Sequence, residues 1–200
     1  IPLLLVLYFS LTIRTPDGLV FSFDNFRRFF EPIYLKVFLR SVYLALISTV
    51  ICLALGYPMA MILAGNNFKR KNVMVFLFVV PMWMNFLLRT YAWMTLLERQ
   101  GLLNTFLTFL GLPPLNLLYT QEAVVLGMVY NFLPFMVLPI YSVLRKIDRQ
   151  LIEAAADLGA DQMTIFRRVI FPLSLPGVMS GITMVFMPAV TTFVISRLLG

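Results

Sequence analysis

The chain has 200 residues, of which 60% are hydrophobic and 12% are charged, and its net charge is +7. Because a soluble domain carries about twice that charged fraction, the composition excludes an ordinary soluble protein and predicts a membrane protein. The basic residues stand singly or in short runs between apolar blocks, which indicates anchors of membrane topology rather than a nucleic-acid-binding surface. The sequence has one cysteine and no histidine, which excludes a disulfide framework, His-based triads and most zinc sites. We therefore predict no metal site.

Long apolar runs predict the membrane-spanning helices. Residues 1–9 are apolar from the first position and are interpreted as the remnant of a helix. Residues 11–36 read as a loop with a turn at Pro16-Asp17-Gly18. Complete spans are expected over 37–64, 73–97, 123–144 and 173–199, because each is long enough to cross the hydrocarbon core. Each contains at least one proline, which is expected to kink it by removing a backbone donor.

These elements predict an all-α, polytopic transmembrane helical bundle made of one domain over residues 1–200. Because the chain begins and stops beside apolar runs, we expect it to be truncated at both ends. Within the loop 98–121, the apolar stretch 102–110 is too short to span and is expected to be an interfacial helix. The basic cluster Lys69-Arg70-Lys71 favours a cytoplasmic position for the loop 65–72, and with it for residues 145–172.

Residues 145–172 form a polar segment that keeps a helical pattern. Asp148 is placed to cap a first short helix, and Gly159 to end it as the residue just past the C-terminus. Asp161 is expected to cap a second short helix, and Pro172 to end that helix and begin the next span. On these features alone two interpretations stay open: an amphipathic cytoplasmic linker, or a projection that docks in a groove of a soluble partner.

The spacing within this segment resembles a known motif. Glu153-Ala154-Ala155, three residues, Gly159, nine residues and Val169-Ile170-Phe171-Pro172 resemble the EAA loop of ABC-importer permeases. The family pattern ends in Ile-x-Leu-Pro, so this chain departs from it at two positions, in each case with one apolar residue for another. The resemblance implies that 145–172 is a cytoplasmic coupling loop whose first helix fits into an ATPase subunit. The implied contact residues are Glu153, Ala154, Ala155, Asp157, Gly159 and Pro172.

Further strings resemble the spermidine/putrescine permease subfamily. They include Leu55-Gly56-Tyr57-Pro58, Pro81-Met82-Trp83-Met84-Asn85, Arg89-Thr90-Tyr91 and the run from Val129 to Met136. The resemblance implies a permease of the type I ABC-importer fold, multi-pass in the bacterial cytoplasmic (inner) membrane, that carries polyamines. It also implies three kinds of protein partner: a second permease subunit, a cytoplasmic ATPase dimer and an extracytoplasmic substrate-binding protein. ATP and Mg²⁺ are expected on the ATPase, because this chain has no Walker-type phosphate loop, and it is expected to be neither an enzyme nor a cofactor-binding protein.

One charge, Arg89, lies well inside a predicted span, which makes it a functional hypothesis. Because Arg89 would repel a polycation, we favour a structural or gating role, held by helix carbonyls or by Glu98 or Glu122. Aromatic faces attract ammonium groups, and Trp93 is one candidate ring. The predicted substrate path consists of Trp83, Asn85, Arg89, Tyr91, Tyr130 and Asn131. Interface anchoring of the aromatic residues and interhelical bonding of the asparagines are the alternatives.

Other functions remain to be weighed against polyamine import. A permease of the same class with another substrate, such as sulfate, iron, phosphonate or an opine, would carry a similar loop. An ion-coupled secondary transporter would need intramembrane carboxylates or a histidine relay, and the predicted spans contain neither. A membrane enzyme would need clustered polar catalytic residues at membrane depth, and the spans lack those as well.

Overall fold

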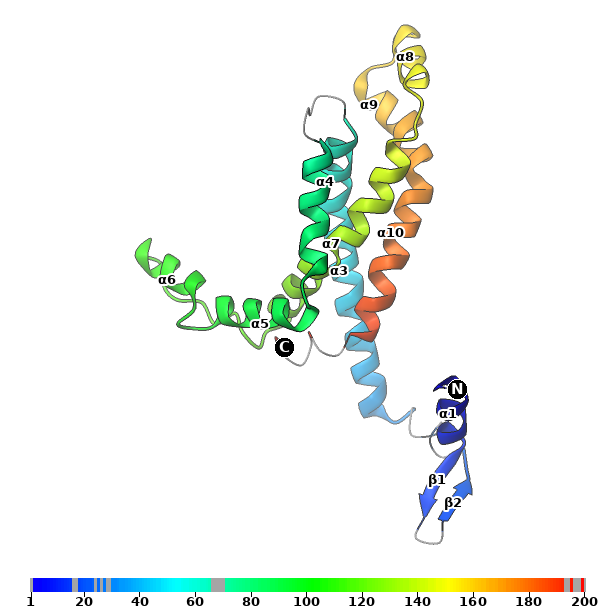
Figure 1. Cartoon of the computed structure of the whole chain (residues 1–200), viewed down its shortest axis with the longest axis vertical. Helices are drawn as coiled ribbons and strands as arrows, with labels where there is room; N and C mark the ends of the chain where they lie inside the picture. Colours follow the sequence, from blue (N-terminus) through cyan, green and yellow to red (C-terminus); the bar gives the residue numbers. More distant parts are fainter. Residues whose placement is uncertain are drawn as a thin grey trace. The chain divides into compact units, whose positions relative to one another are not determined.

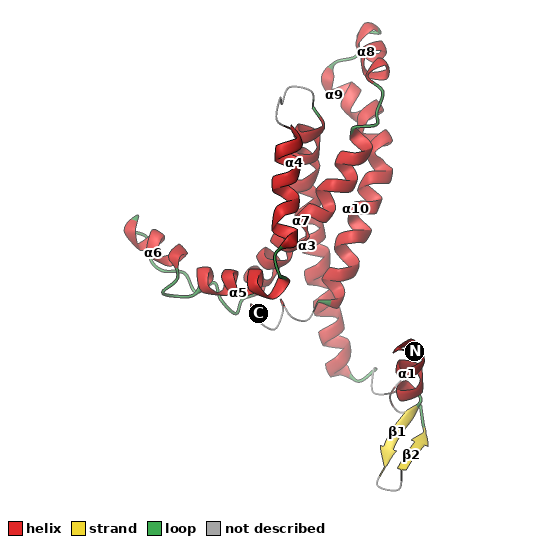
Figure 2. Ribbon diagram, in the orientation of Figure 1, coloured by secondary structure: helices red, strands yellow, loops and turns green. Residues whose placement is uncertain are grey.

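The computed structural model describes residues 2–15, 18–23, 25, 27, 30–65, 71–192, 195 and 199. They fall into two compact units, Ile1–Tyr43 and Leu44–Gly200. Helices dominate the described residues of both units, as the apolar composition predicts (Figures 1 and 2).

The first unit holds a short helix and a hairpin. Helix α1 (Pro2–Ser10) covers the predicted helix remnant. Strands β1 (Thr12–Thr15) and β2 (Gly18–Phe21) pair in antiparallel register, where a loop was predicted. The prediction of an unpaired loop was wrong because β-branched and aromatic residues flank the turn signal on both sides and favour strands. Residues 16 and 17, at the turn itself, lie outside the described residues.

Among the described residues, three helices are long and apolar enough to cross a membrane, and the bent pair Val73–Trp83 and Phe86–Phe109 would make a fourth if it is one span. The first is α3 (Pro32–Ala64), which begins five residues before the predicted span, and the second is α7 (Gln121–Leu144). The third is continuous over Gln162–Thr191 and includes α10 (Phe171–Thr191). Helix α10 confirms most of the predicted last span, whereas the residues after 192 are largely outside the described part of the chain. Prolines lie inside these helices without ending them, as in other membrane helices.

The helix predicted over 73–97 is not continuous: the chain breaks within it, and the two parts form a broken span or a re-entrant pair. Helix α4 (Lys71–Val79) runs into a 3₁₀ turn, η1 (Val80–Trp83), and a new helix, α5 (Phe86–Leu97), begins after Asn85. The directions before and after the break differ by 93°, and Figure 1 shows α5 turned away from α4. The cause is local. The Asn85 side chain accepts a hydrogen bond of 2.8 Å from the amide of Leu87, and so caps a new helix where the old one should have continued.

The apolar stretch 102–110 forms the expected short helix, α6 (Leu102–Phe109). Its buried Asn104 ties the surrounding loops together. The Asn104 Nδ2 donates to the carbonyls of Glu98 (3.1 Å) and Leu115 (2.9 Å), and its Oδ1 accepts from the Leu115 amide at 2.8 Å. One amide side chain therefore satisfies backbone groups on both sides of α6.

Replacing Asn104 by alanine should loosen this region without affecting the bundle. Each backbone group left unpaired in a buried position costs about 1–3 kcal/mol. We expect faster amide hydrogen exchange in residues 110–118 and unchanged exchange in α7. Asn116→Ala is the matched control, because Asn116 lies exposed in the same loop. Equal exchange in the two variants would contradict the role given to Asn104.

Helix α7 is the centre of the second unit, and its sides pack on α3 and α10. On α3, the Cys52 thiol lies 3.8 Å from the carbonyl of Val129. On α10, Gly177 and Gly181 are buried one turn apart and face α7. A β-carbon at Gly177 would lie 3.0 Å from the Pro139 carbonyl oxygen, so a larger residue would require the α7 backbone to give by a few tenths of an ångström. Small residues allow such close backbone approach between membrane helices.

Candidate functional site

The polar segment begins with helix α8 (Arg149–Asp157), which is capped at both ends by residues adjacent to it in sequence. As predicted, Asp148 caps the start: its Oδ1 accepts from the Gln150 amide at 3.0 Å. At the other end Gly159 has a φ of +83°. The amides of Gly159 and Ala160 donate to the carbonyls of Ala156 (2.9 Å) and Ala155 (3.1 Å). This is the Schellman arrangement, and it confirms the predicted helix end at Gly159.

The second short helix, α9 (Gln162–Ile165), begins where Asp161 was predicted to cap it. The Asp161 carboxylate accepts from the amide of Thr164 at 3.3 Å. Hydrogen bonding from the Thr164 side chain, followed by smaller backbone contributions, lowers the pKa of Asp161. Because its pKa is lowered, the charged Asp161 cap stabilises the folded chain at pH values above the ordinary aspartate pKa. This stabilisation is lost as the pH falls through the lowered pKa. At neutral pH the cap is therefore fully formed.

Pro172 does not end this second helix, in contrast to the prediction. The chain passes from α9 through a π-helical turn, η2 (Phe166–Ile170), directly into α10. In η2 the amide of Phe171 donates to the Phe166 carbonyl, five residues back rather than four. The wider turn lies immediately before the proline, where an α-helical donor is missing and a ring must be accommodated. The segment therefore joins the last span as one continuous helix.

Helix α8 lies at one end of the second unit (Figure 1), and its side chains are exposed or only partly buried. None of its nine residues, all of which the structure describes, is buried. Leu151 is 50% exposed, Leu158 at its end is 89% exposed, and Met163 on α9 is 60% exposed. Glu153 and Asp157 are exposed beside them. Exposed apolar side chains on a rigid polar segment are typical of a protein interaction site.

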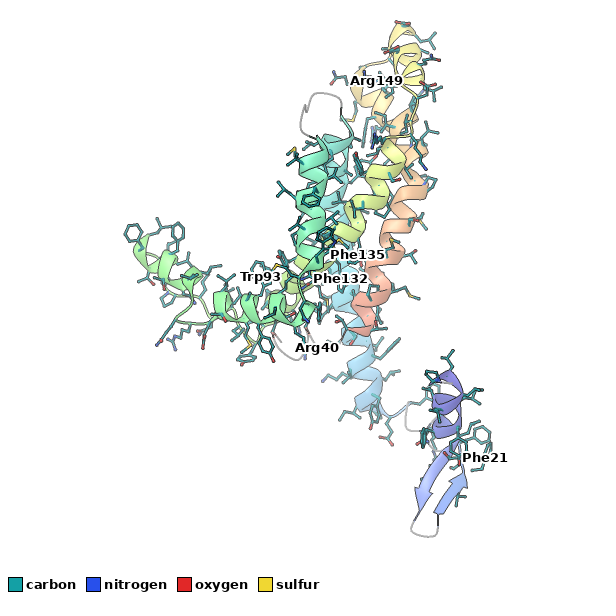
Figure 3. The ribbon with its side chains drawn as sticks, in the orientation of Figure 1. Phe21, Arg40, Trp93, Phe132, Phe135 and Arg149 are labelled. Atoms are coloured by element: carbon teal, nitrogen blue, oxygen red, sulfur yellow. The ribbon has the colours of Figure 1, made fainter. Side chains whose placement is uncertain are left out.

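The structure brings the end of α3 close to α8. A groove of about 370 Å³ separates them, and Arg149, labelled in Figure 3, contributes to its wall. The other lining residues are Met61, Ala64, Gly65, Leu144, Arg145, Ile147, Ile152 and Ile170. The end of α3 and the polar segment thus lie at the same end of the second unit, in agreement with the shared side predicted for them. Residues 66–70 of the basic loop after α3 lie outside the described residues.

Three residues of the predicted substrate path lie in exposed positions near the bend. Trp83 is exposed and packs edge-on against Phe76, with ring centroids 5.8 Å apart. Asn85 is occupied as the cap of α5, and Tyr91 is half exposed on that helix. These three positions have local structural roles or open surfaces, and the structure does not gather them around a common point.

Of the other three residues, Arg89, Tyr130 and Asn131, two carry a buried polar atom without a partner. Among the described residues, the Nε of Arg89 and the Oδ1 of Asn131 are buried and have no hydrogen-bond partner. Asn131 is 2% exposed, and its Nδ2 donates to the carbonyl of Gly127 on its own helix at 2.8 Å. Buried polar atoms without partners are costly. Arg89 Nε therefore lacks the bond that Glu98 or Glu122 was expected to provide.

Trp93 connects the two helices that carry these atoms. Its ring meets that of Tyr130 edge-on at a centroid distance of 5.2 Å, which joins α5 to α7 (Figure 3). Trp93 was considered as a candidate ring but not placed in the predicted path. Its contact with Tyr130 depends on the bend at Asn85, which sequence periodicity does not reveal.

Residues 56–200 match the family of binding-protein-dependent transport system inner membrane components. The chain belongs to this family. It is therefore a transport permease, and its apolar helices make it a multi-pass protein of the inner membrane. The matched region contains the whole polar segment and both residues with unsatisfied buried atoms.

Several characterised permeases are similar to this permease. The spermidine/putrescine transport system permease protein PotB of Escherichia coli is 44% identical over 184 residues, which cover 91% of this chain and 67% of that protein. PotB of Haemophilus influenzae is 41% identical over 207 residues, which cover 100% and 72%. PotB of Salmonella typhimurium is 45% identical, and the match covers 64% of its length. The chain spans about two thirds of the length of such relatives.

A solved structure shares the fold. A chain of a bacterial ABC transporter involved in the import of the acidic polysaccharide alginate superposes with a TM-score of 0.65 at 18% identity. The match covers 88% of this permease and 63% of that chain. It confirms the predicted all-α permease fold.

Proposed function

We propose that this permease provides the membrane path for polyamines in an ATP-driven importer. The PotB relatives, at 41–45% identity, belong to spermidine/putrescine transport systems. A probable sulfate permease protein, cysT of Helicosporidium, is more distant at 28% identity. The balance of similarity therefore favours polyamines over sulfate as the cargo.

The exposed surface of α8 carries the proposed mechanism. In our proposal Leu151, Leu158 and the small residues between them fit into a groove of a cytoplasmic ATPase subunit. Glu153 and Asp157 add charge at the edge of that contact. ATP and Mg²⁺ bind the ATPase, and its closure moves α8. The continuous helix from α9 to α10 carries that movement into the membrane, because no loop interrupts it.

The complete importer would contain further partners. A second permease subunit completes the central path, two ATPase subunits bind the coupling loops, and an extracytoplasmic binding protein delivers the substrate. The lipid bilayer surrounds the outer faces, where apolar side chains such as Leu46, Leu77 and Met184 are exposed.

The substrate path in this chain is proposed to pass the Trp93–Tyr130 pair and Asn131. Aromatic faces attract ammonium groups, and the unpaired Asn131 Oδ1 is an acceptor for an ammonium N–H. Arg89 is suited to gating, because its charge would oppose the residence of a polycation beside it. The unpaired Nε then finds its partner in another state of the transporter or on another subunit.

Replacing Arg89 by alanine should lower polyamine uptake severalfold and leave the ATPase bound. The reason is that the variant removes a charge from the path and does not touch α8. Uptake by whole cells and co-purification of the ATPase measure the two effects. Arg99→Ala is the control, since Arg99 is exposed just after α5. Normal uptake by Arg89→Ala would contradict both the gating role and a direct role in binding.

Transport by the reconstituted importer tests the proposal as a whole. The permease pair, the ATPase and the binding protein would be placed in proteoliposomes with internal or external ATP, and radiolabelled spermidine and putrescine would be followed. We expect ATP-dependent import of both. Sulfate in roughly hundredfold excess, enough to reveal even weak competition, should leave this import unaffected. Import of sulfate without import of either polyamine would reject the proposed cargo but leave the permease assignment intact.

A further inference from the structure

Tyr57 on α3 reaches across to the helix that carries the coupling segment. Its hydroxyl lies 2.8 Å from the Oγ of Ser174 on α10, a residue 117 positions later in the chain. Ser174 is 0% exposed. Tyr57 belongs to the string Leu55-Gly56-Tyr57-Pro58, to which the proposed function assigns no role.

The direction of this hydrogen bond follows from a second one. The Ser174 hydroxyl donates its single hydrogen to the Phe171 carbonyl on its own helix, at 2.8 Å. Since a serine hydroxyl has one hydrogen and two lone pairs, Ser174 must accept from Tyr57. The Tyr57 O–H therefore donates to Ser174, and the chain of two bonds ends on the backbone at Phe171, where η2 meets α10.

The ring of Tyr57 contacts the same junction. It meets Phe166 edge-on at a centroid distance of 5.9 Å and Phe171 at 6.0 Å. Phe166 and Phe171 are themselves 6.2 Å apart. They are the first residue of η2 and the first residue after it, so one side chain of α3 contacts both ends of the π-helical turn.

A π-helical turn is a point where a helix changes register more readily than elsewhere, because it contains one residue more than an α-turn holds. Here Pro172 follows one residue later, after Phe171, and removes another backbone donor. A displacement of α8 would deform this turn and would not reach α10 unless other contacts fix the turn in place. The three aromatic rings and the Tyr57–Ser174 bond hold it against α3.

We propose that Tyr57 is a positioning residue that transmits the movement of the coupling helix to α3. It holds η2 in register, so that displacement of α8 moves α3 together with α10 instead of deforming the turn between α8 and α10. This inference rests on the proposed coupling function of α8. It adds a residue far from that motif in sequence and gives α3 a part in the conformational cycle.

The test compares Tyr57→Phe, Ser174→Ala and the double variant in the reconstituted importer. Tyr57→Phe keeps the ring contacts and removes only the hydroxyl. The quantity measured is spermidine imported per ATP hydrolysed. We expect a fall of about fivefold in each single variant, the factor that the loss of one ordinary hydrogen bond produces. Ser174→Ala removes this bond and also the Ser174 bond to the Phe171 carbonyl. The double variant should therefore fall no further than Ser174→Ala alone, because the bond that Tyr57→Phe removes is already lost. Co-purification of the ATPase should stay at the wild-type level in all three.

Tyr43→Phe is the matched control, since it makes the same substitution at an exposed position of α3. A wild-type ratio in Tyr57→Phe would overturn the proposal, and so would a double variant in which the two losses multiply. Glu153→Lys is measured in parallel to separate this inference from the proposed function. If Glu153→Lys loses the ATPase while Tyr57→Phe couples normally, the inference fails and the coupling function stands. If Glu153→Lys also assembles and couples normally, the coupling function fails with it.

Discussion

Replacing Gly159 by aspartate should lower the amount of ATPase that co-purifies with this permease, and with it polyamine uptake, by at least about tenfold, equivalent to roughly 1.4 kcal/mol. Gly159 has a φ of +83°, a conformation that side chains other than that of glycine rarely adopt. Aspartate tolerates it better than most residues, so strain supplies the smaller part of the loss. The larger part comes from a third carboxylate beside Glu153 and Asp157, placed at the proposed docking surface and without a described neighbour.

A second glycine of the chain provides the control for this prediction. Gly111, at the end of α6, has a φ of +76° and likewise has open space around it. Gly111→Asp therefore introduces the same side chain and similar backbone strain at a site outside the polar segment. It should retain the ATPase. If both variants lose the ATPase equally, the effect is general destabilisation and not the loss of a docking surface.

Glu153→Lys should have a similar effect on co-purification for an electrostatic reason. Glu153 is exposed on α8, so the substitution reverses a charge at the proposed interface without a cost in folding. Restoration of ATPase binding by a compensating charge reversal on the ATPase would identify the residue that faces it. Unchanged co-purification and uptake in both Gly159→Asp and Glu153→Lys would count decisively against α8 as the coupling helix.

Replacing Gly177 by valine should lower the stability of the second unit. A β-carbon there would lie 3.0 Å from the Pro139 carbonyl oxygen and 3.1 Å from the Ile140 α-carbon, both of which belong to the backbone of α7. Because backbone cannot rotate aside as a side chain can, α7 and α10 would have to separate. Overpacking of this kind costs about 1–3 kcal/mol. The apparent melting temperature in detergent and the yield of folded protein measure it.

Ser180→Val is the control for this second prediction. Ser180 lies on the exposed side of α10, three residues after Gly177. Valine there introduces the same side chain with little change in helix propensity. It should melt close to the wild type. A Gly177→Val variant as stable as Ser180→Val would show that α7 and α10 do not pack at the distance described.

The features that were predictable from the sequence depend on short-range chemistry. Asp148, Gly159 and Asp161 were assigned as helix caps because the groups they satisfy lie within three or four residues along the chain, and the structure places all three as expected. The long apolar helices α3 and α7 were predictable for a related reason, since composition over about twenty residues decides whether a helix suits the hydrocarbon core.

The structural features that were not predicted are those for which the hydrophobic pattern fits two different structures equally well. Residues 73–97 are apolar throughout, and nothing in their periodicity distinguishes a kink at Pro81 from the 93° break after Trp83. Pro172 was expected to end a helix, and this prediction failed because the π-turn that accommodates the proline has no sequence signature. The grouping of Trp93 with Tyr130 followed from the break and was therefore missed with it.

Because both ends of α8 are capped, the helix should affect how quickly its complex with a partner forms and separates. Because Asp148 and the Gly159 turn satisfy the terminal amides and carbonyls from within the chain, the helix exists before any partner arrives. Association then orders few additional backbone torsions, and little conformational entropy is lost on contact. A preformed helix of this kind suits a contact that is pushed and pulled in every conformational cycle, since the helix has the same conformation at the end of one cycle and at the start of the next.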